Sequence, residues 1–273
     1  MTFFAATLPA TEIALSGFDP LFIGLARATL ASLASVLLLA ATGSRWPRVH
    51  TLALFVGGLL LVYGFPVCLG LALRTVPSGQ AAVVLAIIPL FTALFAGLWA
   101  GERLSRVFLF WAAAGSLSVA AYIALRSGLM VQQGTVWLVA AAASASAGYV
   151  ISGVLSRTLG GWSVICWMLV LTAPLSVVGT ALTWRPAFGE ASVEAWAALA
   201  FLGLGSMWLG FFFFNRGLAL GGVAKVGQTQ LLQPFLTILF AALLLGQPVT
   251  PAMAGFAALV VLSVAMGRRS AVR

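Results

Sequence analysis

The sequence predicts an all-α integral membrane protein with ten transmembrane helices, arranged as two inverted five-helix repeats around a central cavity. Composition is the first reason, because 62% of the 273 residues are apolar and only 7% are charged, whereas soluble domains carry about 25% charged residues. The apolar residues also form runs of about 20, the length that crosses a bilayer as a helix. These runs lack the alternation of barrel strands. A motif that occurs twice is the third reason.

Glycine, proline and charge clusters divide the apolar residues into ten expected spans. They cover residues 2–16, 20–42, 51–73, 78–101, 105–126, 134–157, 162–184, 193–215, 224–246 and 250–267. The first span is short, since about fifteen residues at 1.5 Å each reach only ~22 Å of a ~30 Å hydrocarbon core. Truncation, a thin span and a partly interfacial helix are all open readings of it.

The repeated motif runs from Pro89 to Gly101 and again from Pro234 to Gly246. Seven of the thirteen positions are identical at a constant offset of 145 residues, which indicates two copies of one unit. We place the copies at 1–128 and 129–273. Because each copy contains an odd number of spans, the second enters the membrane inverted relative to the first.

Basic residues predict the orientation. Ten Lys and Arg residues follow even-numbered spans or lie in the C-terminal tail, and three follow odd-numbered spans. By the positive-inside rule, both termini face the cytoplasm. The formal charge of +9 therefore reports membrane orientation and not nucleic-acid binding.

Enzyme signatures are missing from the sequence. It contains no Walker A, H-E-x-x-H or G-x-S-x-G pattern, and its single histidine, His50, has no neighbours with which to bind a metal. We therefore expect no enzymatic activity and no cofactor.

Small residues recur one turn apart in the repeated motif. Gly97 and Gly101 in the fourth span correspond to Ala242 and Gly246 in the ninth, and such pairs let helices approach closely. Their placement at opposite mouths favours alternate closure of the two mouths. Static packing of the bundle is the alternative.

Prolines and glutamines of the same two spans are candidates for a central site. Pro89 and Pro234 each leave one backbone carbonyl without its helical donor. In the ninth span Gln230, Gln233 and Pro234 lie close together, and Gln80 begins the fourth span. We expect the glutamines to bind substrate through hydrogen bonds, with bonding between helices as the alternative.

Three aromatic residues are candidates for an apolar wall of that site. They are Tyr63 in the third span, Tyr149 in the sixth and Trp208 in the eighth. Core or lipid packing is the alternative for each of them.

Two charges lie well inside spans. Glu12 and Arg27 flank the turn between the first two spans, so they can lie at a similar depth. An unpaired charge there costs several kcal/mol, and we expect an ion pair. A proton-coupling role for Glu12 is the alternative.

The order of these features resembles the EamA family of the drug/metabolite transporter superfamily. The shared features are the Pro89-x-x-Thr92-x-x-x-Ala96 pattern that ends in Gly101-Glu102, the matching ninth span, and an arginine that follows a proline in the second span. The resemblance covers nearly the whole chain. It implies ten helices around a cavity and export of amino acids or related metabolites, with YddG-type exporters of aromatic amino acids as the nearest group.

The chain also departs from that pattern. Glu12 stands where a lysine is common in the family, and Gln233 and Gln247 replace glutamates near the ninth-span proline and at the end of that span. The second repeat thus lacks carboxyls that could titrate, which argues against proton coupling.

We therefore expect a secondary transporter or facilitator that exports small metabolites across the bacterial inner membrane by alternating access. Amino acids with aromatic or other apolar side chains are the expected substrates, and the protein is expected to act as a monomer in the lipid bilayer. A proton-coupled exporter of drugs or other metabolites and a membrane channel are the alternatives.

Overall fold

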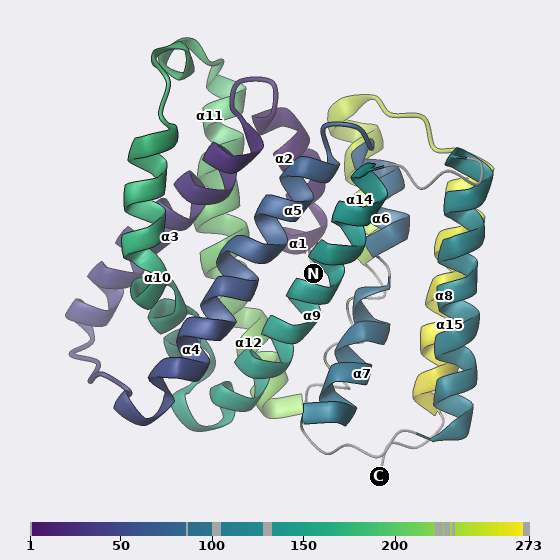
Figure 1. Ribbon diagram of the computed structural model, residues 1–273, viewed down its shortest axis with the longest axis horizontal. Coiled ribbons are helices and arrows are strands. Elements are labelled where there is room, and N and C mark those ends of the chain that lie inside the picture. Colours follow the sequence, from purple (N-terminus) through teal and green to yellow (C-terminus); the bar gives the residue numbers. More distant parts are fainter. Residues whose placement is uncertain are drawn as a thin grey trace.

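The computed structural model describes residues 2–85, 87–99, 105–127, 133–221, 226, 230 and 233–269. Within these ranges all regular structure is helical and no strand occurs, which confirms the all-α class (Figure 1).

The helices follow the expected spans with local interruptions. They are α1 (Thr2–Ala5), α2 (Thr7–Ala14), α3 (Pro20–Ala41), α4 (Thr51–Gly58), α5 (Phe65–Ala72), α6 (Ser78–Leu85), α7 (Ile88–Trp99), α8 (Arg106–Ser127), α9 (Gln133–Leu159), α10 (Gly161–Thr183), α11 (Val193–Ala200), α12 (Gly210–Gly221), α14 (Gln233–Leu245) and α15 (Pro251–Arg269). Two 3₁₀ turns, η1 (Arg48–His50) and η3 (Pro186–Glu190), and two π-helical stretches, η2 (Leu59–Gly64) and η4 (Phe201–Leu209), join them.

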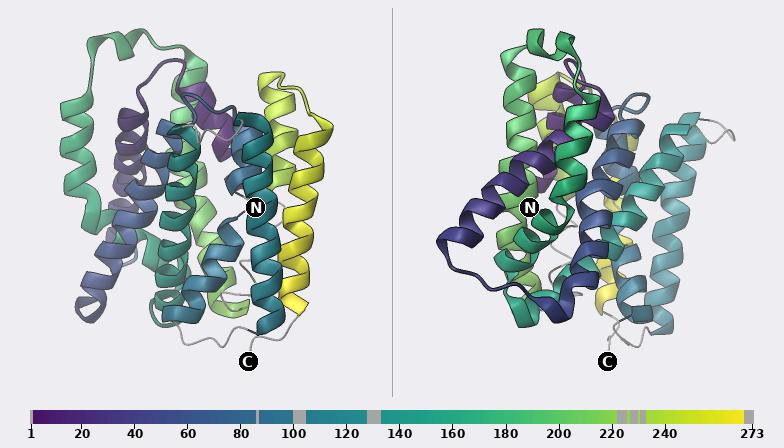
Figure 2. Two further views of the ribbon diagram at one scale, coloured as in Figure 1. Left: turned by 45° about the vertical axis from the view of Figure 1, so that its right-hand side comes forward. Right: turned by 60° about the vertical axis from the view of Figure 1, so that its left-hand side comes forward.

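Six helical stretches in the described part are long and apolar enough to cross a membrane. They are Pro20–Ala41, Arg48–Ala72, Gln80–Trp99, Gln133–Leu159, Gly161–Thr183 and Val193–Leu220, and Phe235–Leu245 and Pro251–Ser263 are shorter apolar helices. In the bundle α3 packs along α10, α5 and α7 pack against α9, and α8 pairs with α15 at one side (Figures 1 and 2).

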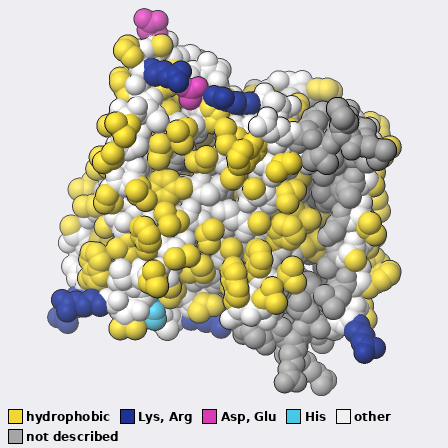
Figure 3. Space-filling model, viewed as in Figure 1, with side chains coloured by type: hydrophobic (Ala, Val, Ile, Leu, Met, Phe, Trp, Pro, Cys, Tyr) yellow, Lys and Arg dark blue, Asp and Glu magenta, His cyan; other side chains and the backbone are white. Residues whose placement is uncertain are grey.

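The surface has the character of a membrane protein. Figure 3 shows hydrophobic side chains over the middle of the visible face and charged side chains at its two ends. Large apolar side chains such as Leu37, Leu98 and Leu182 are exposed, and a water-soluble monomer rarely exposes continuous apolar surface of this kind. The chain is therefore a multi-pass membrane protein.

One of these ends is tied together by Asp19. Asp19 precedes α3, Arg74 follows α5 and Arg185 follows α10. The Asp19 carboxylate oxygens lie 3.0 Å from Nη2 of Arg74 and 3.0 Å from Nη1 of Arg185. We call this end the Asp19 rim. Because all three side chains are at least partly exposed, the bridges fix the positions of three helix ends more than they add to stability.

The expected first span forms two short helices instead of one. The helix is interrupted at Ala6, between α1 and α2, and Figures 1 and 2 show α1 at mid-height within the bundle. The segment thus begins in the interior, and α2 leads toward the Asp19 rim.

Pro9 explains how this first segment is held. Proline has no backbone N–H, so the carbonyl of Ala5, four residues earlier, loses its helical donor. The hydroxyl of Thr237 in α14 donates to the Ala5 carbonyl oxygen over 3.0 Å. Since a bilayer offers no water to a freed carbonyl, this hydrogen bond ties α14 to α1.

Replacing Thr237 with valine removes that donor while the side-chain volume is kept. We expect T237V to lower the free energy of unfolding by about 1–2 kcal/mol, measured by thermal or denaturant unfolding in detergent. T237S, which keeps the hydroxyl, should unfold like the wild type.

The double variant P9A/T237V tests the assigned reason. Pro9→Ala supplies a backbone N–H to the Ala5 carbonyl, so T237V should cost less in this background than in the wild type. Equal costs in both backgrounds would contradict the assignment.

Candidate functional site

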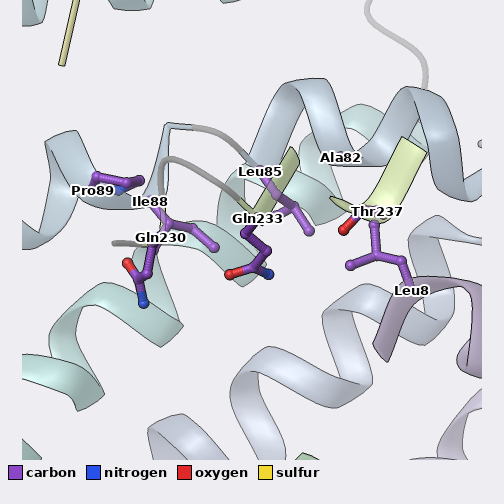
Figure 4. Close-up of a pocket in the computed structure, with 8 residues that line it drawn as sticks. All are labelled: Leu8, Ala82, Leu85, Ile88, Pro89, Gln230, Gln233 and Thr237. Carbon is purple, nitrogen blue, oxygen red and sulfur yellow. The ribbon is translucent and has the colours of Figure 1, made fainter. Parts of the chain in front are cut away.

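The candidate site lies where interrupted helices meet. α6 ends at Leu85 and α7 begins at Ile88, next to Pro89, while α14 begins at Gln233. An internal space at this point is lined by Leu8, Ala82, Leu85, Ile88, Pro89, Gln230, Gln233 and Thr237 (Figure 4). Two of the six expected substrate-binding residues, Gln230 and Gln233, therefore face a common space.

The space has little room in this conformation, and for that reason we call it the closed space. It leaves about 10 Å³ for the centres of water-sized molecules, which is room for about one water. An amino acid cannot fit there without movement of the lining helices.

Gln230 is the least satisfied polar group of the lining. Its side chain is 3% exposed, and neither its Nε2 nor its Oε1 has a hydrogen-bond partner in the described part of the chain. Leaving a buried amide unpaired costs about 1–3 kcal/mol for each group. In Figure 4 the amide of Gln233 points in the same direction as that of Gln230. The Gln233 Nε2 atom lies 3.5 Å from the carbonyl oxygen of Phe4.

Aromatic residues pack around Phe4 of α1. Phe4 lies edge-on to Phe211 and Phe214 of α12, with ring centroids 5.1 and 5.4 Å away. Tyr149 of α9 packs on the same two rings at 6.0 and 5.1 Å. We call Phe4, Tyr149, Phe211 and Phe214 the aromatic cluster. It adjoins the closed space through Phe4, whose carbonyl meets Gln233.

The other expected binding residues lie elsewhere. The hydroxyl of Tyr63 donates to the Thr172 carbonyl over 2.6 Å, so it joins η2 to α10. Trp208 packs edge-on against Phe212 at 4.8 Å, and its buried indole Nε1 has no partner among the described residues. Gln80 is half-buried in α6 and is not among the residues that line the closed space.

The expected ion pair between Glu12 and Arg27 does not form in this structure. Glu12 accepts hydrogen bonds from Gln247 Nε2 at 2.6 Å and from the backbone N–H of Ser78 at 2.9 Å. Ser78 is the first residue of α6, and the free N–H groups of a helix N-terminus favour a carboxylate. Equal depth in the membrane therefore did not imply contact, because Glu12 faces α6 and the end of α14.

Glu12, Ser78 and Gln247 form a small polar group that we call the Glu12 triad. The Ser78 hydroxyl also lies 3.4 Å from Gln247 Oε1, so the triad links α2, α6 and the segment after α14. Sequence analysis noted Gln247 only as a departure from a family pattern and did not single out Ser78. The serine before an apolar run was the available signal, since serine favours helix starts.

The expected gating residues have varied surroundings. Gly246 has a φ of +63°, and a Cβ added there would meet no atom within 4 Å. Its backbone N–H bonds to Ala242 O and that of Gln247 to Ala241 O, which is the glycine-terminated end of a helix. In this conformation Gly246 therefore ends α14 and is not a close crossing point.

Gly97 and Ala242 are half-buried on α7 and α14. Gly101 lies outside the described residues, as does the side chain of Pro234.

Interrupted helices that meet inside a membrane bundle are a feature of many solute transporters. Residues 1–124 and 132–267 match the EamA-like transporter family. The chain belongs to this family, which is a family of transporters and not of enzymes.

Two relatives carry names that bear on function. The chain is 40% identical over 269 residues to the uncharacterized transporter YdeK of Bacillus subtilis, with 98% of this chain and 94% of YdeK covered. It is 29% identical over 261 residues to a probable terminal-alkyne amino-acid exporter of Streptantibioticus cattleyicolor, with coverage of 90% and 83%. A protein of known crystal structure, 22% identical, matches with a TM-score of 0.70 over 98% of this chain and 93% of that one, which shows a shared fold.

Removing the carboxylate of the Glu12 triad should open the closed space. In Glu12→Ala the Ser78 N–H and the Gln247 amide lose their acceptor, a loss of about 1–3 kcal/mol. We expect a cysteine placed at Ala82 to react about tenfold faster with a maleimide in detergent, in a background without Cys68 and Cys166.

Glu190→Ala, which removes an exposed carboxylate that is not part of the triad, is the matched control and should leave the rate unchanged. Equal rates in the wild type and Glu12→Ala would show that the triad does not hold the space closed.

Proposed function

We propose that this protein is a secondary transporter or facilitator that exports small metabolites, foremost amino acids, across the inner membrane by alternating access. The observation that carries the proposal is a narrow internal space, flanked by helix interruptions, whose buried Gln230 amide has no partner among the described residues. A hydrogen-bonding solute would satisfy that amide when the space widens.

The proposed architecture is ten helices in two inverted repeats, 1–128 and 129–273. The repeated motif supports it, and so do the π-helical stretches η2 and η4, which fall in the third and eighth expected spans, at equivalent places in the two units. The family also matches in two segments that divide near residue 128.

We place the Asp19 rim outside the cell and the opposite rim in the cytoplasm. At the Asp19 rim, Arg74 and Arg185 are both paired with Asp19. Arg45 and Arg48 follow the opposite end of α3, and Arg157 lies in the last turn of α9. The C-terminus would be cytoplasmic by this orientation. A cytoplasmic N-terminus remains a prediction, because α1 begins at mid-height (Figure 1).

Alternating access would use the fourth and ninth spans. Under this proposal the Glu12 triad closes the outer mouth, and Pro89 and Pro234 mark the points where α7 and α14 tilt. Small residues of these two spans would then contact neighbouring helices more closely in other conformations of the transport cycle. They are Gly97, Gly101, Ala242 and Gly246.

Amino acids with apolar side chains fit the proposed site best. The aromatic cluster would supply apolar rings if it opened, and Gln230 and Gln233 line the space with amides for the polar end of a solute. The exporter of Streptantibioticus cattleyicolor is named for an amino acid with an apolar terminal alkyne, which supports the same class.

A proton-coupled exporter of drugs or other metabolites is the second candidate. The observation that favours it is the position of Glu12, whose carboxylate accepts two hydrogen bonds that link three segments at one mouth. Protonation would weaken both bonds and so couple opening to a proton.

Transport into proteoliposomes tests the proposal. We expect saturable uptake of a labelled apolar amino acid, with Gln230→Ala reducing the initial rate about tenfold because substrate binding loses hydrogen bonds. Flux without a pH gradient would establish a facilitator, and flux that needs the gradient would favour the proton-coupled candidate. Absence of flux for every amino acid would contradict the proposed substrate class.

Gln133→Ala is the matched control for this assay. Gln133 begins α9 and is exposed, so its replacement should leave transport unchanged. A rate that falls equally in both variants would show a nonspecific effect and would contradict the role of Gln230.

A further inference from the structure

Arg27 is a buried charge with no counter-charge among the residues that the structure describes. It is the eighth residue of α3, which places it about 10 Å into the span, and it is 3% exposed. Both salt bridges among the described residues belong to Asp19. The Arg27 Nε is buried without a hydrogen-bond partner in the described part of the chain.

Burying an unpaired guanidinium destabilises the protein unless a bound ligand offsets the loss of hydration. Removing a guanidinium from water costs several kcal/mol, and a buried charge in a natural protein is normally paired. The carboxylate expected to pair with it, Glu12, is bound by Ser78 and Gln247 instead. The partner of Arg27 must therefore come from outside the described chain or be solvent.

The surroundings of Arg27 connect it to the proposed binding region. Tyr149 lies near enough to interact with the guanidinium electrostatically, and Tyr149 belongs to the aromatic cluster. On the other side, η4 approaches the backbone of α3 closely, since a Cβ on Gly203 would lie 2.9 Å from the Arg27 carbonyl oxygen. Arg27 is thus positioned between a π-helical stretch and an apolar aromatic surface.

We propose that Arg27 binds the carboxylate of the transported solute, while the aromatic cluster receives its apolar side chain. This inference rests on the proposed export of amino acids and names the group by which they are recognised. A guanidinium forms two parallel hydrogen bonds with a carboxylate, and both ions are then neutralised inside the membrane. A neutral amide or an amine in place of the carboxylate leaves the guanidinium unpaired.

The test compares L-phenylalanine with L-phenylalaninamide, which lacks only the carboxylate charge. Binding to the purified full-length protein is measured by calorimetry in detergent, for the wild type, Arg27→Gln and Arg27→Lys. We expect the wild type to bind phenylalanine at least about 30-fold more tightly than the amide. Arg27→Gln should lose this preference, and Arg27→Lys should retain part of it.

Arg48→Gln is the matched control, because Arg48 is exposed in the connection after α3. It should bind both compounds like the wild type. Equal affinity of the wild type for the acid and the amide, or an unchanged preference in Arg27→Gln, would overturn the proposal.

Stability without solute separates a binding role from a structural one. Because the described chain gives Arg27 no partner, Arg27→Gln should unfold at the same temperature as the wild type or higher. A clearly lower unfolding temperature, or failure to fold, would show that the guanidinium supports the fold and would overturn the proposal.

Phenylacetate, a carboxylate without an amino group, distinguishes this inference from the proposed function. Binding of phenylacetate that depends on Arg27, without flux of any amino acid, would retain the anion site and reject amino-acid export. Flux of phenylalanine that is equal in the wild type and Arg27→Gln would retain export and reject the role of Arg27.

Discussion

The lack of water in the hydrocarbon core is the constraint on which this structure depends, because every polar group in a span must find its partner inside the protein. Pro9 removes one helical donor, and the hydroxyl of Thr237 supplies another from α14. Ser146 of α9 likewise donates to Ile88 O beside the α6–α7 interruption, over 3.0 Å. Hydroxyl groups of neighbouring helices thus hold irregular segments in place without closing the bundle permanently.

Because of the same constraint, buried polar groups that lack a partner are candidates for binding a solute. Gln230 and Arg27 are both buried, and both keep polar atoms without partners among the described residues. The aromatic cluster lies near both regions, because the carbonyl of Phe4 accepts a hydrogen bond from Gln233 and Tyr149 interacts electrostatically with Arg27. Both polar groups and the apolar surface near them suit a solute that has a charged end and an apolar side chain.

The sequence predicts where helices cross the membrane better than it predicts which neighbours their side chains contact. The all-helical class and the positions of the long apolar helices followed from the apolar runs. The hydrogen bonds of Tyr63 and Glu12 did not, since an apolar run fixes where a helix crosses the membrane but not its rotation or its neighbours. Gly246 was expected at a helix crossing and instead ends α14 with a positive φ, because one residue type serves both purposes.

Arg27 and Gln230 are proposed to bind the transported solute. Solid-state NMR can test this proposal with phenylalanine labelled with ¹³C at the carboxyl carbon and protein labelled with ¹⁵N in arginine, reconstituted in lipid. The account predicts a dipolar contact between the carboxyl carbon and a guanidinium nitrogen that disappears in Arg27→Lys. Bound phenylalanine whose carboxyl carbon shows no contact with any arginine would contradict it.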